Sequence, residues 1–94
     1  MTTKNKEQVE VEVITEESVI SSGYVILFDD NFHTFDEVID QLILATGCSH
    51  KQANLFAWEV HTKGQCVVFK GEFEKCLFVS QVLEEISLKT EVVL

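Results

Sequence analysis

The chain of 94 residues contains no proline, no arginine and only four glycines. This composition excludes a Pro-rich linker, a collagen-like repeat and a low-complexity tract. Hydrophobic residues make up 46% of the chain and include seven Phe and one Trp. That is enough for one compact core and too little for two domains with a cleft between them, so we expect a single domain.

Basic residues are scarce as well. Seven Lys stand against sixteen Asp and Glu, and the formal net charge is −9. This is the wrong sign for neutralising phosphates, so nucleic acid is not expected as a partner. An acidic surface instead attracts cationic groups, which on a protein partner means Lys, Arg or an amino terminus.

The number of cysteines, the amino-terminal sequence and the length of the apolar runs indicate the cellular compartment. The three cysteines are odd in number and have no CxxC spacing. The amino terminus lacks the basic-then-apolar pattern of a secretory signal, and no apolar run approaches the roughly 20 residues that span a bilayer. We expect a cytoplasmic protein that does not contact a membrane.

The sequence offers little support for two classes of enzyme, those that use zinc and those that use a thiol. Zinc ligands could be assembled from Cys48, His50, His61, Cys66 and Cys76, but the usual pairs at short intervals are missing. A thiol enzyme using Cys48 with His50 or His61 lacks a local signature, and the chain has no phosphate loop or GxSxG elbow. We expect no metal, no cofactor and no catalysis; metal analysis and thiol alkylation would test this alternative.

The chain divides into a tail and a domain. Residues 1–22 are polar and acidic except for alternating Val and Glu over residues 9–13, which predicts a flexible tail, with a short edge strand there as the alternative. Residues 23–94 form the expected domain. Within it, the β-branched and aromatic residues 24–28 predict a strand, followed by a polar turn.

Helix signals are clear in the middle of the chain. Thr34 and Glu37 have the spacing of a capping box, and Gly47 is placed to end a helix. Together they predict a helix over residues 35–46. A second box at Ser49 and a stop at Gly64 predict a helix over 49–63.

The last third predicts a strand over residues 65–70, a turn at Gly71, a helix over 73–86 and a strand over 90–94. The element order is β-α-α-β-α-β. We expect a compact two-layer α+β domain, with three helices covering one face of a three-stranded sheet.

Two polar clusters should meet at an edge between helix and sheet. The turn with Asp29 and Asp30, beside the imidazole of His61, would make a receptor for an ammonium group, because charge-assisted hydrogen bonds are strong. The alternative is that the turn residues only shape the turn and that His61 is a solvated helix end.

The turn and the following helix resemble the ClpS family of protease adaptors and the ClpS-like domain of eukaryotic N-end-rule ubiquitin ligases. The run Asp29-Asp30-Asn31-Phe32-His33-Thr34-Phe35 aligns with the family's first motif. Ala53 to Val60-His61, followed by Gly64, aligns with the second. The resemblance covers about residues 24–94 and implies a fold similar to the carboxy-terminal domain of the ribosomal stalk protein.

The resemblance also implies a function. It predicts an adaptor that binds the free amino-terminal residue of N-degron substrates and delivers them to a Clp-type AAA+ ATPase-protease. By position, Asp29, Asp30 and His61 would hold the α-amino group. The pocket for the first side chain would be lined by His33, Phe35, Val38, Ala57 and Val60.

Several positions depart from the bacterial family. Asp29 stands in place of Asn, Phe35 in place of a pocket-mouth Met, and Ala57 in place of another Met, so the preferred first residue is expected to differ. Docking to the amino-terminal domain of the ATPase would use Glu72 and Leu77, the latter in place of a Lys. The alternative function is an interaction module of the same fold that modulates the ATPase's substrate choice without reading amino termini.

Overall fold

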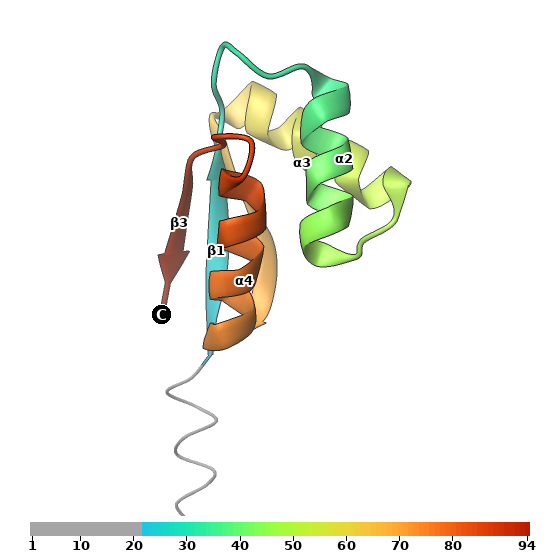
Figure 1. The fold of residues 1–94 in the computed structure, drawn as a ribbon. Helices are drawn as coiled ribbons and strands as arrows, with labels where there is room; N and C mark the ends of the chain where they lie inside the picture. Colours follow the sequence, from blue (N-terminus) through green and yellow to red (C-terminus); the bar gives the residue numbers. More distant parts are fainter. Residues whose placement is uncertain (1–21) are drawn as a thin grey trace, which may run out of the picture.

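The computed structural model describes residues 22–94, which form three strands and three helices (Figure 1). The elements are, in chain order, β1 Ser22–Phe28, α2 Phe35–Thr46, α3 His50–Lys63, β2 Gln65–Glu72, α4 Phe73–Glu84 and β3 Thr90–Val93. The predicted order and the α+β class are confirmed. No helix among residues 22–94 is long and apolar enough to cross a membrane.

The sheet is antiparallel throughout and has the strand order β2-β1-β3. Strand β1 is central because its inward side chains, Val25 and Leu27, are fully buried and it pairs on both edges. A bulge opposite Val25 and Ile26 inserts Val68 into β2, and this side chain is also buried.

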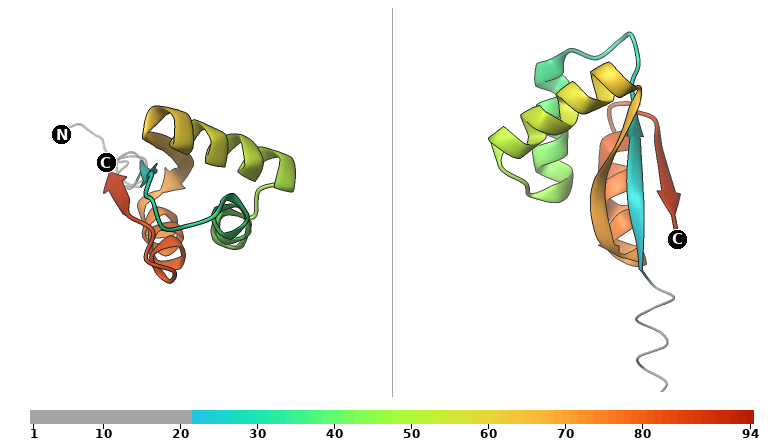
Figure 2. Two further views of the ribbon diagram at one scale, coloured as in Figure 1. Left: turned by 90° about the horizontal axis from the view of Figure 1, so that it is seen from above. Right: turned by 180° about the vertical axis from the view of Figure 1, so that it is seen from behind.

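The helices pack on one side of this sheet. Helix α4 lies along one face, while α2 and α3 lie together beside β2 (Figure 2). The core between these layers is built from apolar side chains of every element, with Leu42 of α2, Ala53 of α3 and Leu83 of α4 fully buried. The expected two-layer packing is confirmed.

Local signals fix both helices of the α2–α3 pair. Thr34 accepts from the backbone N–H of Glu37 at 3.1 Å, and the Glu37 carboxylate accepts from the Thr34 N–H at 2.8 Å. Ser49 caps α3 by accepting from the Gln52 N–H, so this helix start shows a single cap bond and not the reciprocal pair of the predicted second box. Gly47 and Gly64 both have left-handed backbone conformations, as a glycine stop requires.

Some predicted boundaries were wrong. Gly71 is not a turn: β2 continues through it to Glu72, because Gly71 pairs with Gly23 of β1. Helix α4 ends at Glu84, two residues before Ile86, and the chain turns at Ser87 with φ of 67°. The predicted tail and its edge-strand alternative lie outside the described residues, except for Ser22, which begins β1.

Candidate functional site

The loop after β1 is fixed against two other parts of the chain. The N–H of Phe28 donates to the Lys89 carbonyl at 3.0 Å, and the N–H of Asp29 donates to the Gly64 carbonyl at 2.9 Å. Because Gly64 ends α3, the second bond brings the last turn of that helix beside Asp29. His61 lies in that last turn.

A cavity of about 290 Å³ opens at this junction. It is lined by Leu27, Phe28, Asp29, Asp30, Asn31, His33, Thr34, Phe35, Val38, Ala57, Val60, His61 and Leu88. All eight residues predicted for the amino-group and side-chain sites are among them. The predicted convergence of the acidic turn with His61 is therefore present.

Asp29 and His61 face each other across the mouth of the cavity. The Asp29 Oδ2 and His61 Nδ1 atoms are 4.0 Å apart, which is too long for a direct hydrogen bond. The side chains are 35% and 58% exposed, respectively, so both are open to a ligand.

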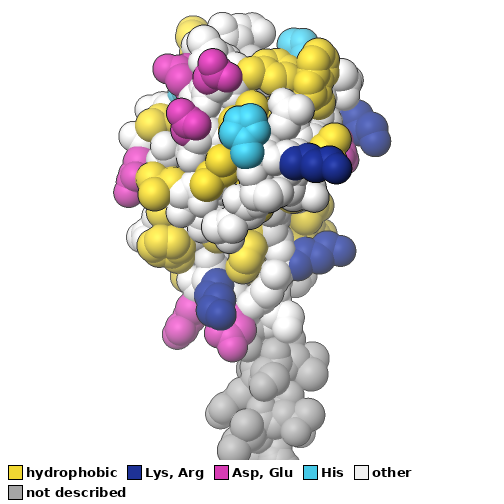
Figure 3. Space-filling model, turned by 90° about the vertical axis from the view of Figure 1, so that its right-hand side faces the viewer, with side chains coloured by type: hydrophobic (Ala, Val, Ile, Leu, Met, Phe, Trp, Pro, Cys, Tyr) yellow, Lys and Arg dark blue, Asp and Glu magenta, His cyan; other side chains and the backbone are white. Residues whose placement is uncertain are grey.

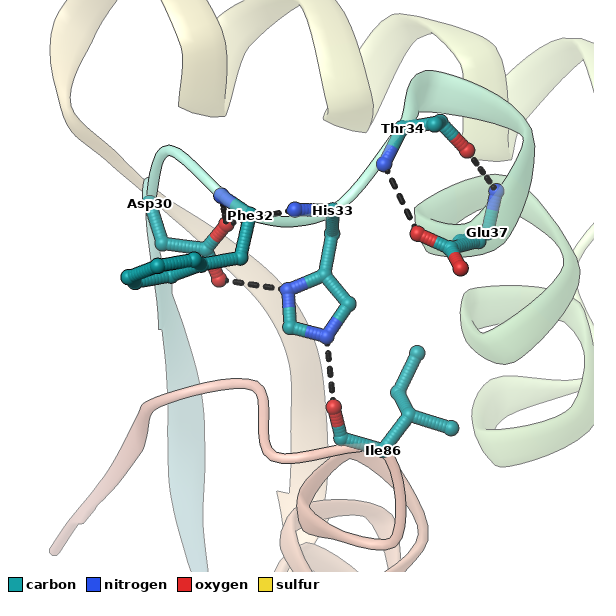
Figure 4. A network of polar contacts seen from close by, with 6 residues as sticks. All are labelled: Asp30, Phe32, His33, Thr34, Glu37 and Ile86. Carbon is teal, nitrogen blue, oxygen red and sulfur yellow. Dashed lines mark hydrogen bonds and ion pairs between the residues drawn. The ribbon is translucent and has the colours of Figure 1, made fainter.

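Asp30 has a different role within the loop. Its Oδ1 accepts from the backbone N–H groups of Phe32 and His33 at 2.9 and 3.0 Å, and its Oδ2 lies 2.6 Å from His33 Nδ1 (Figure 4). Burial on its own raises the pKa of Asp30. The bonds from the His33 and Phe32 backbone and from the His33 ring outweigh burial, so the net pKa lies below the ordinary value. Asp30 is an ionised acceptor that shapes the loop.

His33 connects this loop to the other side of the cavity. Its Nε2 lies 2.5 Å from the Ile86 carbonyl oxygen, beyond the end of α4 (Figure 4). The bond to Ile86 and then that to Asp30 raise the pKa of His33 above its ordinary value, although burial opposes them. Its side chain is only 13% exposed.

The rest of the cavity is apolar. Ala57 and Val60 of α3 are each 4% exposed and lie beneath the polar mouth, with Val38 of α2 half-buried beside them. Phe35 is also half-buried and makes edge contacts with the rings of Trp58 and His61, at centroid distances of 4.9 and 5.4 Å. The aromatic contacts tie the imidazole of His61 to the first turn of α2.

Five lining residues had not been predicted as residues of the amino-group site or of the pocket. These are Leu27, Phe28, Asn31, Thr34 and Leu88. Leu88 is 3% exposed and reaches the cavity from the connection between α4 and β3. The only signal for Leu88 was that it is apolar, and no periodicity marks it within the short connection of residues 85–89.

The two residues predicted for ATPase docking lie away from the cavity. Glu72 is exposed at the junction of β2 and α4, and Leu77 of α4 is 43% exposed. Phe78, which the sequence had not singled out, is 56% exposed beside Leu77. Hydrophobic side chains also reach the surface among charged ones on the side where α2 and α3 lie (Figure 3).

The cysteines were the basis of the alternative metal or thiol site. Within residues 22–94, no group of three or more His, Cys, Asp or Glu side chains could hold a metal ion. Burial, and then the neighbouring Glu59, raises the pKa of Cys66 to about 11. Burial also raises the pKa of Cys76, although a hydrogen bond with the Gly71 backbone opposes this effect. Both thiols are therefore protonated and weakly nucleophilic at neutral pH.

Comparison with known proteins gives consistent results. Residues 21–91 match the family model described as ATP-dependent Clp protease adaptor protein ClpS. The fold resembles that of Agrobacterium tumefaciens ClpS2 bound to L-phenylalaninamide, with a TM-score of 0.62, 19% identity, and coverage of 77% of this chain and 96% of that one.

Two curated relatives extend the comparison to eukaryotes. The chain is 40% identical over 53 residues to the E3 ubiquitin-protein ligase UBR2 of mouse and of human. The match covers 56% of this chain but only 3% of each ligase. Because the family model spans most of the described fold, the conclusion is plain: the chain belongs to the ClpS adaptor family.

Proposed function

We propose that this protein binds the free amino terminus of N-degron substrates, reading the ammonium group and the first side chain together, and delivers them to a Clp-type AAA+ ATPase-protease. The observation that carries the proposal is the junction of Asp29, Asp30 and His61 at the mouth of an apolar cavity. The protein itself would catalyse nothing and would work in the cytoplasm.

The spacing at the mouth suits an ammonium group. Two acceptors that each lie about 2.8 Å from one tetrahedral nitrogen are about 4.6 Å apart. The 4.0 Å between Asp29 Oδ2 and His61 Nδ1 is near that separation, so a small movement would let one ammonium donate to both. Asp30 Oδ2 has one bonded neighbour, and a carboxylate oxygen can accept twice, so it could take the third hydrogen.

The cavity beneath is large enough for one aromatic side chain. A dry engineered cavity on the order of 150 Å³ binds benzene, whereas this one measures about 290 Å³. Burying a large apolar side chain there would contribute roughly 2 to 3 kcal/mol. With a similar contribution from the ammonium contacts, and with the ordering of the peptide opposing both, we expect micromolar affinity.

Calorimetry with short peptides tests this function. A peptide with a free amino-terminal Phe should bind, and its acetylated form should not, because acetylation removes the charge and two of the three donors. Asp29→Ala and His61→Ala, which each remove an acceptor, should each weaken binding about tenfold, whereas His50→Gln, at the exposed first turn of α3, should not. Equal affinity for the free and acetylated peptides would reject the proposal.

Delivery requires a second surface. We place it on α4, where Leu77 and Phe78 expose apolar area beyond Glu72. The amino-terminal domain of the partner ATPase would dock there, leaving the cavity free. If the ATPase domain binds and no free-amine peptide does, the protein is instead a module that tunes the ATPase's substrate choice.

A further inference from the structure

The ring of His33 lies between two hydrogen-bond acceptors. Its Nδ1 is 2.6 Å from Oδ2 of Asp30, and its Nε2 is 2.5 Å from the carbonyl oxygen of Ile86, which stands 53 residues later in the chain. A carbonyl oxygen can only accept, and Asp30 already accepts two backbone N–H groups as an ionised carboxylate. A neutral imidazole carries one N–H, so it could satisfy only one of these two neighbours.

We propose that His33 is a positioning residue that acts as an imidazolium, donating to Asp30 and to the Ile86 carbonyl at once. This pair of bonds, the His33 clamp, holds the loop of Asp29 and Asp30 against the end of α4 (Figure 4). Its effect on amino-terminus binding rests on the proposed function, but the clamp itself does not.

The charges around His33 favour the protonated ring. Asp30 lies in contact with it from the loop, and Glu37 of α2 adds a second negative charge nearby. The Ile86 carbonyl lies just beyond the carboxy-terminal end of α4, whose last turn contains no basic residue. A cation there interacts favourably with the negative end of the helix dipole.

Other charged groups near the loop and the end of α4 have partners of their own, and Lys89 Nζ lies 5.5 Å from the centre of the Phe28 ring. At the end of α4, Glu84 accepts from Thr90 at 3.1 Å, and Glu85 is contacted by Gln41 at 3.5 Å. Asp29 and His61 belong to the same cavity lining, where they face each other. The clamp is thus a side-chain link between the amine-facing loop and the α4–β3 connection, in addition to the backbone bond from Phe28 to Lys89.

The clamp makes the loop sensitive to pH in a defined direction. The folded-state pKa of His33 is raised above its unfolded value of 6.5, so its stabilising contribution is complete below pH 6.5 and is lost as pH rises through the folded pKa. The pKa of Asp30 is lowered below 3.8, so that contribution persists until the pH falls through its folded pKa. The clamp should therefore be intact at mildly acidic pH and should open as the pH rises through the raised pKa of His33.

The first test needs no variant of His33. The chain has three histidines, so ¹⁵N NMR can follow each ring, with His50→Gln and His61→Gln used only to assign signals. We expect the His33 ring to carry protons on both nitrogens below pH 6.5 and to titrate above that value, and Asp30→Asn to shift that titration downward. A His33 ring that titrates at or below pH 6.5 would overturn the clamp, whether or not the protein binds peptides.

The second test concerns positioning. His33→Gln keeps one hydrogen-bond donor but cannot donate a charged bond to both Asp30 and Ile86. The affinity of this variant for a Phe peptide with a free amine should therefore fall about tenfold at pH 6.5. The ratio of wild-type to variant affinity should shrink as pH rises, and deprotonation of the peptide cancels in that ratio. His50→Gln should show a ratio near one at every pH. The positioning role would be refuted if the wild-type protein binds the peptide but the ratio of wild-type to His33→Gln affinity does not change with pH.

Discussion

Ala57→Leu should make the protein at least as stable while weakening its affinity for peptides with a large first residue. Ala57 is 4% exposed and lines the cavity of about 290 Å³, so a leucine there can grow into existing space. Ala53, one turn earlier on α3, is fully buried and does not line the cavity. Ala53→Leu is therefore a matched control on the same helix.

The magnitudes follow from the space available. Leucine adds three carbons, worth about 0.8 kcal/mol each when buried, and loses roughly 0.5 to 1 kcal/mol of rotamer entropy. Full burial of the leucine in Ala57→Leu would thus raise the free energy of unfolding by about 1.4 to 1.9 kcal/mol, and partial exposure in the cavity would reduce this gain toward zero. Ala53→Leu has no space to fill and should destabilise by about 1 to 3 kcal/mol through overpacking.

Ala57→Leu should weaken the affinity for peptides that begin with a large residue, although it does not lower the stability. A buried Phe side chain contributes roughly 2 to 3 kcal/mol, so the wild type should prefer a Phe-leading over an Ala-leading peptide by about 30- to 150-fold. In Ala57→Leu this ratio should fall toward one. Denaturant unfolding and calorimetry measure the two quantities. A destabilised Ala57→Leu variant would show that the cavity has no room for the leucine. A variant that retains the full preference for Phe would show that the cavity does not receive the first side chain of the peptide.

Three further predictions concern other parts of the molecule. Gly23→Ala should destabilise the fold by roughly 1 to 3 kcal/mol, as measured by denaturant unfolding, because a Cβ there would lie 2.7 Å from the backbone oxygen of Val93. With a pKa of about 11, the Cys66 thiol should be alkylated at pH 7 at least about a hundredfold more slowly in the folded protein than in denaturant, and equal rates would contradict its burial. Leu77→Glu should weaken binding to the ATPase amino-terminal domain about tenfold or more and leave peptide affinity unchanged, as parallel titrations would reveal.

The parts of the fold that the sequence predicted correctly depend on short-range chemistry. The reciprocal bonds of Thr34 and Glu37 and the left-handed Gly47 are all local, and they set both ends of α2. Gly71 was misjudged because its place in β2 depends on pairing with Gly23, which is far away in the chain. Long-range pairing thus overrode the usual association of glycine with a turn.

In the candidate site, too, short-range features could be predicted from the sequence and long-range contacts could not. The convergence of Asp29 with His61 could be anticipated from the two motifs and the family resemblance. The bonds that Asp30 accepts from Phe32 and His33 are local turn chemistry. In contrast, the contact from His33 to Ile86 and the entry of Leu88 into the cavity depend on how the α4–β3 connection folds back over the loop. No local pattern encodes such contacts.

The most direct test of the account is an amide-resolved NMR titration with L-phenylalaninamide, which carries a free amine and one aromatic side chain. Chemical-shift changes should concentrate in residues 29–38, in residues 57–64 and at Leu88, which surround the cavity. The N-acetylated compound at the same concentration should cause none. Equal changes with both compounds, or changes centred on another surface, would contradict the claim that this cavity reads an amino terminus.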